Sequence, residues 1–471
     1  MSVVSSLPKQ GIDKNVPLYC VGIGGAGMSV IAELLHMQGW RVMGSDRYES
    51  DTLKRLRTLG ITCNSGHDGH DVPSDAVLVV SSAIPVDNPQ VVVALERKQL
   101  IIHRSHALML ASAKMDFIAI AGAHGKTTTS AMTAHCLQEC GIDASFAVGG
   151  IVGGFGTGAY LGSAPYFVAE ADESDGSFIN YQPSIAVVTN IEADHLDHYG
   201  TSEAFFEAFV SFSHRVRDNG VLICCADDRG ARMLATKAAS VCRVITYGTS
   251  TAVTGCEHVH IVHEQSEGEA TDITFYDGKE VVELRLSMLG HHNVLNACAA
   301  WLVGKLCGGD RNALCAAFSS FEGTGRRFEH RGCVGGVNVI DDYAHHPTEL
   351  EALMKQARTY VGNGQLHVIF QPHLFSRTRN FAQRFADALS QADDVIVTKI
   401  YPAREEPMPG VTGELITSLL PSSVYCEDMY EAGRAMASRA QPGDVILTVG
   451  AGDITHVASF IVSDYEGTSR Y

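Results

Sequence analysis

The chain has 471 residues, of which 45% are hydrophobic and 19% are charged. This composition is typical of a soluble globular protein with about three domains and excludes a disordered or fibrous chain. The formal net charge of −18 argues against duplex nucleic acid as a partner, because phosphate backbones are bound by basic surfaces. An anionic substrate must therefore be met by local positive charge or by a metal ion.

Short β-branched runs alternate with helical patterns along the chain, an arrangement typical of parallel α/β sheets. The runs form three series. They predict an N-terminal domain over residues 1–113, a central domain over 114–325 and a C-terminal domain over 326–471. The polar, strand-like stretch 249–289 is expected to form an antiparallel insert in the central domain. We therefore predict a three-domain α/β protein.

In the first series, Gly22-Ile-Gly-Gly-Ala-Gly27 follows a strand and precedes a helix, and Asp46 ends the next strand. Glycines at this spacing let the backbone approach a diphosphate at a helix N-terminus, as in Rossmann-like domains. Alone, the motif predicts an NAD-dependent oxidoreductase. A nucleotide-sugar diphosphate satisfies the same loop, with Asp46 binding a hydroxyl or the uracil edge. We favour a UDP-sugar over NAD because the following domain carries an ATP motif.

That ATP motif is Ala121-Gly-Ala-His-Gly-Lys-Thr-Thr-Thr129, which directly follows an apolar strand and opens a helix. Lys126 is expected to reach the terminal phosphates, and Thr127 to offer a hydroxyl to Mg²⁺. Backbone N–H groups around the turn can cradle phosphates; these belong to Gly122, Ala123, His124, Gly125 and Thr128. The strict P-loop pattern has a glycine where this chain has Ile120. We predict a central domain of the P-loop ATPase-like type.

Two acidic segments follow at the ends of neighbouring predicted strands, Glu170-Ala-Asp-Glu-Ser-Asp175 and Thr189-Asn-Ile-Glu-Ala-Asp-His-Leu-Asp197. Carboxylates and imidazole at adjacent strand ends can bind one or two hard cations, here Mg²⁺ or Mn²⁺. Which carboxylate contacts the metal stays open at this point.

The third series supplies further cationic groups. Gly323-Thr-Gly-Arg-Arg-Phe328 offers two guanidinium groups to a polyphosphate or a transferring phosphoryl group. Phe370-Gln-Pro-His-Leu-Phe-Ser-Arg-Thr-Arg379 offers His373, Arg377 and Arg379 after a strand, and an arginine there can grip a small carboxylate. Asp341-Asp-Tyr-Ala-His-His-Pro-Thr348 follows another strand.

Together these motifs resemble the Mur ligase family, and the resemblance covers essentially the whole chain. It rests on the Gly-Lys-Thr loop, on the glutamate at 170, on Thr-Asn-Ile-x-x-Asp-His, and on two further motifs, His292-Asn-Val-Leu-Asn296 and Arg326-Arg-Phe-Glu329. Within the family, the N-terminal glycine loop, Asp341-Asp-Tyr-Ala-His-His-Pro347 and Phe370-Gln-Pro-His373 resemble those of the alanine-adding members.

The resemblance implies a Rossmann-like C-terminal domain and an enzyme of peptidoglycan precursor synthesis. The implied reaction is ATP- and Mg²⁺-dependent ligation of L-alanine to the lactyl carboxylate of UDP-N-acetylmuramate through an acyl phosphate. A recycling ligase that attaches a tripeptide to the same UDP-sugar is the nearest alternative. The partners expected are these small molecules, with no nucleic acid, and the chain is expected to be a monomer or a weak homodimer.

The resemblance also assigns roles to individual residues. Glu170 and His195 complete the metal coordination begun by Thr127, and with Lys126 and Arg377 they form the expected catalytic set. The nucleotide is contacted by Asn293 and Arg327, and its ribose by Asp342. The alanine side is formed by Tyr343, His373 and Arg377. The UDP-sugar is held by Gly24, Gly25, Ala26, Gly27, Ser82 and His106.

Two departures from the family pattern refine these assignments. Some relatives carry a basic residue where this chain has Leu374, which leaves Arg377 to bind the alanine carboxylate. Later-acting family members use a carbamylated lysine, but no lysine lies between Lys126 and Lys237. His195 is expected to take its place as a neutral ligand.

The expected location is the cytoplasm. The thirteen cysteines show no Cys-x-x-Cys pairs, which is typical of reduced thiols. The start of the chain lacks a basic segment followed by an apolar core, and no apolar run reaches membrane-spanning length.

Overall fold

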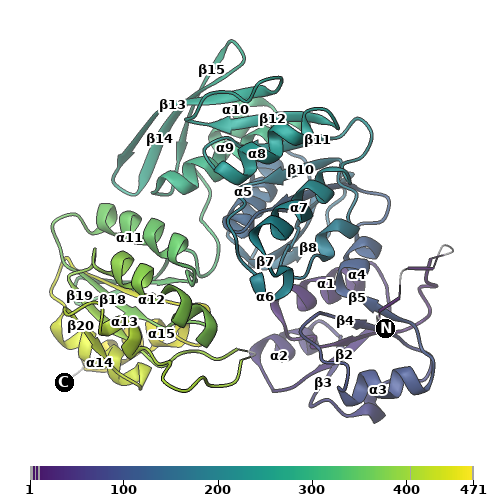
Figure 1. The fold of residues 1–471 in the computed structure, drawn as a ribbon, viewed down its shortest axis with the longest axis horizontal. Helices are drawn as coiled ribbons and strands as arrows, with labels where there is room; N and C mark the ends of the chain where they lie inside the picture. The colour runs from purple at the N-terminus through teal and green to yellow at the C-terminus, as the bar shows by residue number, and fades with distance from the viewer. Residues whose placement is uncertain (1–3, 6, 9–10, 404, 469–471) are drawn as a thin grey trace. The chain divides into compact units, whose positions relative to one another are not determined.

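The computed structural model describes residues 4–5, 7–8, 11–403 and 405–468 (Figure 1). The chain forms two compact units. The first runs to Glu264 and includes Ile273–Arg285 and Leu295–Phe321, whereas the second comprises Gln265–Asp272, Leu286–Val294 and the chain from Glu322 onward. Among the described residues, no helix has the length and apolar character needed to cross a bilayer.

The first sheet has five strands in the order β3-β2-β1-β4-β5, all parallel. The strands are β1 (Leu18–Val21), β2 (Val42–Asp46), β3 (Thr62–Ser65), β4 (Val77–Val80) and β5 (Ile101–His103). The helices between them are α1 (Ala26–Met37), α2 (Asp51–Thr58), α3 (Pro89–Glu96) and α4 (Arg104–Ala111). The strand order reverses between β1 and β4, and this switch point is where ligands bind in open α/β sheets.

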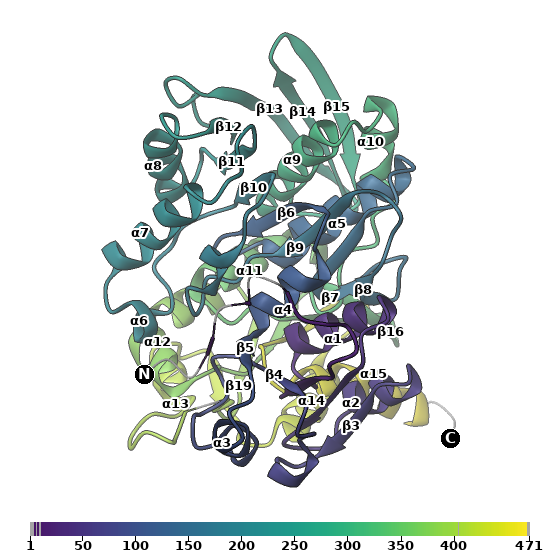
Figure 2. The same ribbon diagram turned by 90° about the vertical axis from the view of Figure 1, so that its right-hand side faces the viewer.

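The second sheet has ten strands in the order β15-β14-β13-β12-β11-β10-β6-β9-β7-β8. They are β6 (Asp116–Ala121), β7 (Ser145–Val152), β8 (Thr157–Tyr160), β9 (Tyr166–Glu170), β10 (Ile185–Val188), β11 (Val221–Cys225), β12 (Arg243–Gly248), β13 (Glu257–Glu267), β14 (Ala270–Asp277) and β15 (Glu280–Leu286). The helices are α5 (Lys126–Glu139), α6 (Leu196–Tyr199), α7 (Ser202–Ser213), α8 (Arg229–Ala238), α9 (His291–Leu306) and α10 (Arg311–Ala317). Helix α1 of the first sheet packs beside β7 and β8 (Figure 2).

The predicted antiparallel insert is built as an extension of this sheet. Its first strand, β13, pairs in parallel with β12. Connections of two residues then join β13 to β14 and β14 to β15. A connection this short can join only antiparallel strands. The insert therefore starts with a parallel pair before it becomes a meander.

The third sheet lies in the second unit and has the order β16-β17-β21-β18-β19-β20, with β16 antiparallel at one edge. Its strands are β16 (Glu329–Val334), β17 (Val337–Asp342), β18 (Leu366–Phe370), β19 (Asp394–Val397), β20 (Ser423–Tyr425) and β21 (Val445–Val449). Its helices are α11 (Pro347–Val361), α12 (Phe375–Leu389), α13 (Glu414–Thr417), α14 (Met429–Arg439) and α15 (Thr455–Thr468). Alternate residues of β18 enter two different cores, Val368 one and Ile369 the other, so both faces of the sheet are covered.

The three sheets confirm the predicted α/β class with parallel sheets. A strand precedes each of the predicted P-loop, N-terminal glycine and acidic motifs. Each glycine or acidic motif stands at the carboxyl end of its strand, which is where the site begins.

Helix α7 attaches to the central sheet through aromatic side chains. Phe205, Phe209 and Phe212 are at most 1% exposed. Phe209 and Phe212 pack against Phe178, and Phe205 packs against Phe209. The spacing of three and four residues places them on one face of the helix. Thr201 caps the helix by accepting the Ala204 N–H at 3.1 Å.

We expect Phe209→Ala to lower the free energy of unfolding by about 3–5 kcal/mol, because the truncation leaves a cavity in a close-packed core. Phe206→Ala, on the same helix but only half-buried, should cost less. Urea unfolding followed by far-ultraviolet circular dichroism measures the free energy of unfolding of both variants. Equal costs for the two variants would contradict the packing described for this helix.

Candidate functional site

The P-loop is the turn between β6 and α5, and two of its glycines adopt backbone angles that other residues avoid. Gly122 has φ of 130° and Gly125, the N-cap of α5, has φ of 84°. The first-turn N–H groups of α5 have no partner within the helix, and the helix dipole adds partial positive charge there. Thr127 and Thr128 lie in this turn, as the sequence predicted.

Residues after β10 brace the P-loop through the backbone of His124. Asn190 accepts the His124 N–H at its Oδ1 (2.9 Å) and donates from its Nδ2 to the His124 carbonyl (2.9 Å). Thr189 donates its hydroxyl to the same carbonyl at 2.6 Å. A Cβ at Gly122 would lie 2.1 Å from the Thr189 hydroxyl, so only glycine fits this approach. From the sequence, the Thr-Asn pair was predicted only as part of a metal-binding segment, and its bracing role was not foreseen.

A second brace comes from helix α9. Asn296 accepts a hydrogen bond from the Thr129 hydroxyl at 3.1 Å, and its Oδ1 would lie 2.8 Å from a Cβ at Gly125. Asn293 stands one turn earlier on the same helix, where its side-chain amide donates to the Leu289 carbonyl at 2.9 Å. The Asn-x-x-Asn spacing in the sequence could have indicated that Asn296 faces the same side of the helix as Asn293.

Lys126, with a side chain 15% exposed, packs against its own loop and a carboxylate. Its Nζ donates to the carbonyls of Gly122 (2.5 Å) and Ala123 (3.3 Å) and to Glu173 Oε1 (2.8 Å). Burial would lower the pKa of Lys126, but the charges of Glu173 and Asp172 outweigh it, so its pKa is raised. The lysine is therefore fully charged, as phosphate binding requires. Glu173 was quoted in the acidic motif but was given no role.

The predicted metal ligands lie around this ion pair. His195 Nε2 is 3.8 Å from Glu173 Oε1, at a residue with φ of 52°. Glu170, at the end of β9, accepts the Gly149 N–H at 2.7 Å and adds to the negative field on Lys126. Glu173 is 1% exposed, and its Oε2 has no hydrogen-bond partner among the described residues. Hydroxyl, carboxylate and imidazole donors next to an unpartnered buried oxygen fit a hard divalent cation.

The N-terminal glycine loop lies at the switch point of the first sheet. Asp46 Oδ2 accepts the Gly24 N–H at 2.8 Å, so this carboxylate holds the loop itself. Gly25 is the N-cap of α1, and Ala26 and Gly27 form its first turn. A Cβ at Gly27 would lie 3.2 Å from Arg104 Nη1. The sequence missed Arg104, although it directly follows a strand end at this edge.

The other two residues predicted to hold the UDP-sugar lie near the same edge. Ser82 donates to Asp175 Oδ2 at 2.7 Å and lies 3.2 Å from His103 Nε2. His106, in α4, has a buried Nδ1 without a hydrogen-bond partner in the described part of the chain. Burial, together with His103, lowers the pKa of His106, which keeps its imidazole neutral.

In the second unit, the charge of Arg327 acts on the buried carboxyl group of Asp342. Asp342 is buried at the end of β17 and accepts the N–H groups of Phe328 and Ala344, both at 2.7 Å. Burial raises the pKa of Asp342 to about 6, against the opposing charge of Arg327. The Arg327 guanidinium lies 5.3 Å from the ring centre of Tyr343.

The ring of His345 lies between the rings of Tyr343 and His373, two of the three residues predicted for the alanine side. The ring centres of Tyr343 and His345 are 5.3 Å apart, and those of His345 and His373 are 5.6 Å apart. His373 Nδ1 lies 3.3 Å from Arg377 Nη1, and Arg377 is 7% exposed. Burial lowers the pKa of His345 to about 4. The sequence missed His345, although the double histidine was quoted.

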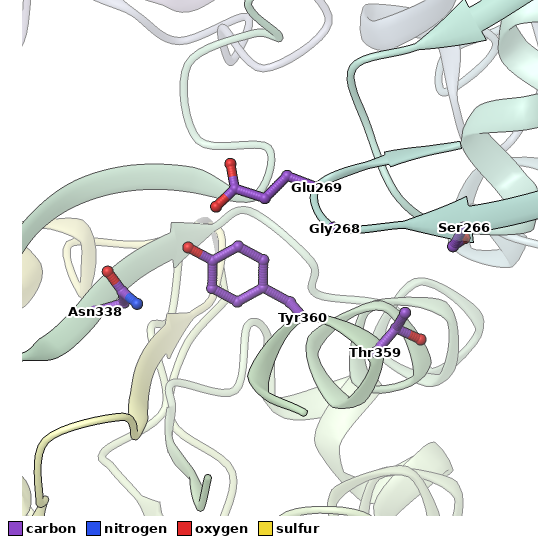
Figure 3. Close-up of a pocket in the computed structure, with 6 residues that line it drawn as sticks. All are labelled: Ser266, Gly268, Glu269, Asn338, Thr359 and Tyr360. Atoms are coloured by element: carbon purple, nitrogen blue, oxygen red, sulfur yellow. The ribbon is translucent and has the colours of Figure 1, made fainter. Parts of the chain in front are cut away.

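A separate polar cavity of about 380 Å³ lies in the second unit, between the tip of the β13–β14 hairpin and α11 (Figure 3). Its lining includes Glu269 and Tyr360, whose side chains face one another in the close-up. Burial, with Glu269 next, raises the pKa of Tyr360 to about 12. None of its six lining residues is a predicted site residue.

Three α/β sheets, a braced P-loop and a second glycine loop at a switch point define a nucleotide-binding enzyme of the P-loop class. Family models match nearly the whole described chain. Residues 17–114 match the Mur ligase family catalytic domain, residues 120–304 the Mur ligase middle domain, and residues 326–452 the Mur ligase glutamate ligase domain. The chain belongs to the Mur ligase family.

Individual relatives match at full length. The chain is 46% identical to the UDP-N-acetylmuramate–L-alanine ligase of Renibacterium salmoninarum over 94% of this chain and 95% of the relative. It is also 46% identical to the ligase of the same name from Paenarthrobacter aurescens, over 97% and 99%. The crystal structure of the UDP-N-acetylmuramate–alanine ligase of Thermotoga maritima is similar with a TM-score of 0.82 and 29% identity, covering 96% of this chain and all of that one (100%).

We expect Asn190→Ala to weaken binding of an ATP analogue by about tenfold to thirtyfold, because it removes two hydrogen bonds of about 1 kcal/mol each to the P-loop backbone. Calorimetric titration with Mg²⁺ and AMP-PNP measures the effect. Asn312→Ala, at an exposed position of α10, is the matched control and should bind as the wild type does. Unchanged affinity in Asn190→Ala would show that the brace does not shape the loop.

Proposed function

We propose that this protein ligates L-alanine to the lactyl carboxylate of UDP-N-acetylmuramate, using ATP and Mg²⁺ and passing through an acyl phosphate. The products are ADP, phosphate and UDP-N-acetylmuramoyl-L-alanine. The observation that carries the proposal is the 46% identity to proteins named UDP-N-acetylmuramate–L-alanine ligase over nearly all of both chains. The NAD-dependent alternative finds no support among these relatives.

The recycling alternative is less well supported. The murein peptide ligase from Psychrobacter arcticus has a TM-score of 0.71 and 25% identity, against 0.82 and 29% for the alanine ligase from Thermotoga maritima. Both matches cover 96% of this chain, so the difference does not arise from coverage. The alanine-adding activity is therefore the function we propose.

On the ATP side, the chain positions and neutralises charge. Lys126 exchanges its contacts with the P-loop carbonyls and Glu173 for the terminal phosphates. The first turn of α5 offers Thr127 and Thr128, together with the partial positive charge of the helix end. Phosphoryl transfer needs alignment and charge neutralisation rather than a nucleophilic side chain. Buried, braced groups provide both, because they need little rearrangement during the reaction.

The residues that would hold Mg²⁺ are Thr127, Glu170 and His195, and the unpartnered oxygen of Glu173 makes this residue a further candidate. The ion, when bound, neutralises charge on the transferring phosphoryl group. His195 can act as a ligand only as a neutral imidazole. The nucleotide's remaining contacts are proposed for Asn293, Arg327 and Asp342.

On the acceptor side, Arg377 is proposed to bind the carboxylate of L-alanine, because a guanidinium pairs with a carboxylate in bidentate fashion. Tyr343 and His373 form the walls beside it. The amine of alanine then attacks the acyl phosphate carbon, and phosphate leaves from the tetrahedral intermediate. No side chain forms a covalent bond in this scheme, so the residues act by orientation.

We expect Lys126→Ala to lower the rate of phosphate release by about 100- to 1000-fold, because a buried charge that stabilises the transition state is lost. The assay contains UDP-N-acetylmuramate, ATP, Mg²⁺ and L-alanine. Lys355→Ala, an exposed residue of α11, should retain wild-type rates. Wild-type activity in Lys126→Ala would rule out the proposal. Phosphate release with the tripeptide but not with single amino acids would instead favour the recycling ligase.

We expect Arg377→Met to raise the KM for L-alanine by about 10- to 100-fold, the loss typical of a charged hydrogen bond. The KM for UDP-N-acetylmuramate should change little. Arg379→Met provides the control, since Arg379 lies two residues further along α12 and is exposed. Steady-state kinetics with each substrate varied in turn separate the two effects. Equal changes in both KM values would remove Arg377 from the alanine side.

A further inference from the structure

Residues 171–177, which follow β9, form a loop that we call the acidic loop. Three of its residues carry carboxylates, Asp172, Glu173 and Asp175. The P-loop lies on one side of it and the carboxyl edge of the first sheet on the other. All of these residues belong to the first compact unit.

Toward the first sheet, the acidic loop is held by charged and polar side chains at the ends of β4 and β5. Arg104 Nη2 lies 2.5 Å from Asp172 Oδ2 and 3.7 Å from Asp175 Oδ2. His103 Nε2 lies 3.3 Å from the same Asp175 oxygen, to which Ser82 also donates at 2.7 Å. Parallel strands bring these side chains to one edge of the sheet.

Toward the P-loop, the acidic loop holds Lys126 through Glu173, the residue next to Asp172. The Glu173 carbonyl also accepts the Tyr199 hydroxyl at 2.5 Å, which limits how far the loop can move. Asp172 pairs with Arg104 on one side, and the residue next to it in the chain, Glu173, pairs with Lys126 on the other. The acidic loop therefore contacts one cation on each side, Arg104 and Lys126.

Arg104 also faces the N-terminal glycine loop. Its Nη1 lies 3.2 Å from the position of a Cβ on Gly27, in the first turn of α1. An anion bound at that turn meets the guanidinium on the side away from Asp172. A diphosphate there and Asp172 would share one cation. Asp172, less neutralised by Arg104, would then add negative charge beside Glu173, where the Mg²⁺ that accompanies ATP is expected to bind.

We propose that Arg104 is a positioning residue that couples the two nucleotide sites through the acidic loop, so that UDP-N-acetylmuramate strengthens binding of Mg²⁺-ATP. The proposal rests on the proposed function, which names the ligand of the glycine loop. The coupling is reciprocal, as any linkage between two binding equilibria must be. Neither Arg104 nor Asp172 needs to touch ATP.

The test measures the Kd of Mg²⁺ and AMP-PNP by calorimetry, with and without saturating UDP-N-acetylmuramate, on the full chain. For the wild type, we expect the nucleotide sugar to lower this Kd by about fivefold or more. In Arg104→Met and in Asp172→Asn, the ratio of the two Kd values should fall to within about twofold of one. The double variant should lose no more than either single variant, because the two changes break one contact.

The matched control is Asn180→Ala. It removes a neutral hydrogen bond of 2.9 Å from Asn180 to the Ser105 hydroxyl, which joins the segment that follows the acidic loop to α4. This variant should keep the wild-type ratio, whereas an equal loss would mean that any contact between the sheets suffices and would overturn the proposal. A wild-type ratio near one, or a wild-type ratio retained in Arg104→Met, would also overturn it. If Arg104→Met fails to fold, the ratio of Kd values in Asp172→Asn tests the proposal instead.

Failure of the proposed function would look different. In that case UDP-N-acetylmuramate would give no binding heat with the wild type and no phosphate release. Failure of the coupling alone leaves both ligands bound and the enzyme active, with the two sites independent.

Discussion

The buried ion pair between Lys126 and Glu173 is the interaction on which the arrangement of the site depends. A charged ammonium 15% exposed and a carboxylate 1% exposed are costly to remove from water unless each is paired and hydrogen-bonded. The P-loop carbonyls supply the other partners of the lysine. Strand β9 lies directly beside β6 in the sheet, and this adjacency brings the acidic loop to the P-loop. The sheet order therefore brings the acidic loop to the lysine, and the turn after β9 places Glu173 against it.

The same constraint explains the two asparagine braces. The N–H groups that the first turn of α5 offers to phosphate cannot also hold the loop in place, so residues from elsewhere fix its shape, in part by accepting the His124 N–H. Asn190 comes from the strand on the other side of β6, and Asn296 from helix α9. Both contacts require glycine in the loop, at Gly122 and Gly125, because a Cβ would collide with the brace.

Motifs at strand ends were predictable because they depend on neighbours in the sequence. The P-loop, the N-terminal glycine loop and the acidic segments were found from a strand, a turn and a helix in succession. What could not be predicted depends on contacts between distant segments. Glu170 and Glu173 are equally plausible partners of Lys126 in the sequence, and only the turn after β9 directs Glu173 to it. Arg104 and Asn296 lie 68 and 167 residues from their partners Asp172 and Thr129.

The order of strands also has a consequence for biosynthesis. The first sheet is complete once β5 has been made, and it can form while the rest of the chain is still being synthesised. The P-loop emerges soon afterwards, but its brace at Asn190 is encoded 66 residues later than His124. Until β10 leaves the ribosome, the glycine-rich turn lacks Asn190, and the buried strand β6 lacks one of its two neighbouring strands. Distant pairing of this kind slows folding, because the intervening chain must be closed first. During that interval the central domain would be the part of the nascent protein most in need of a chaperone.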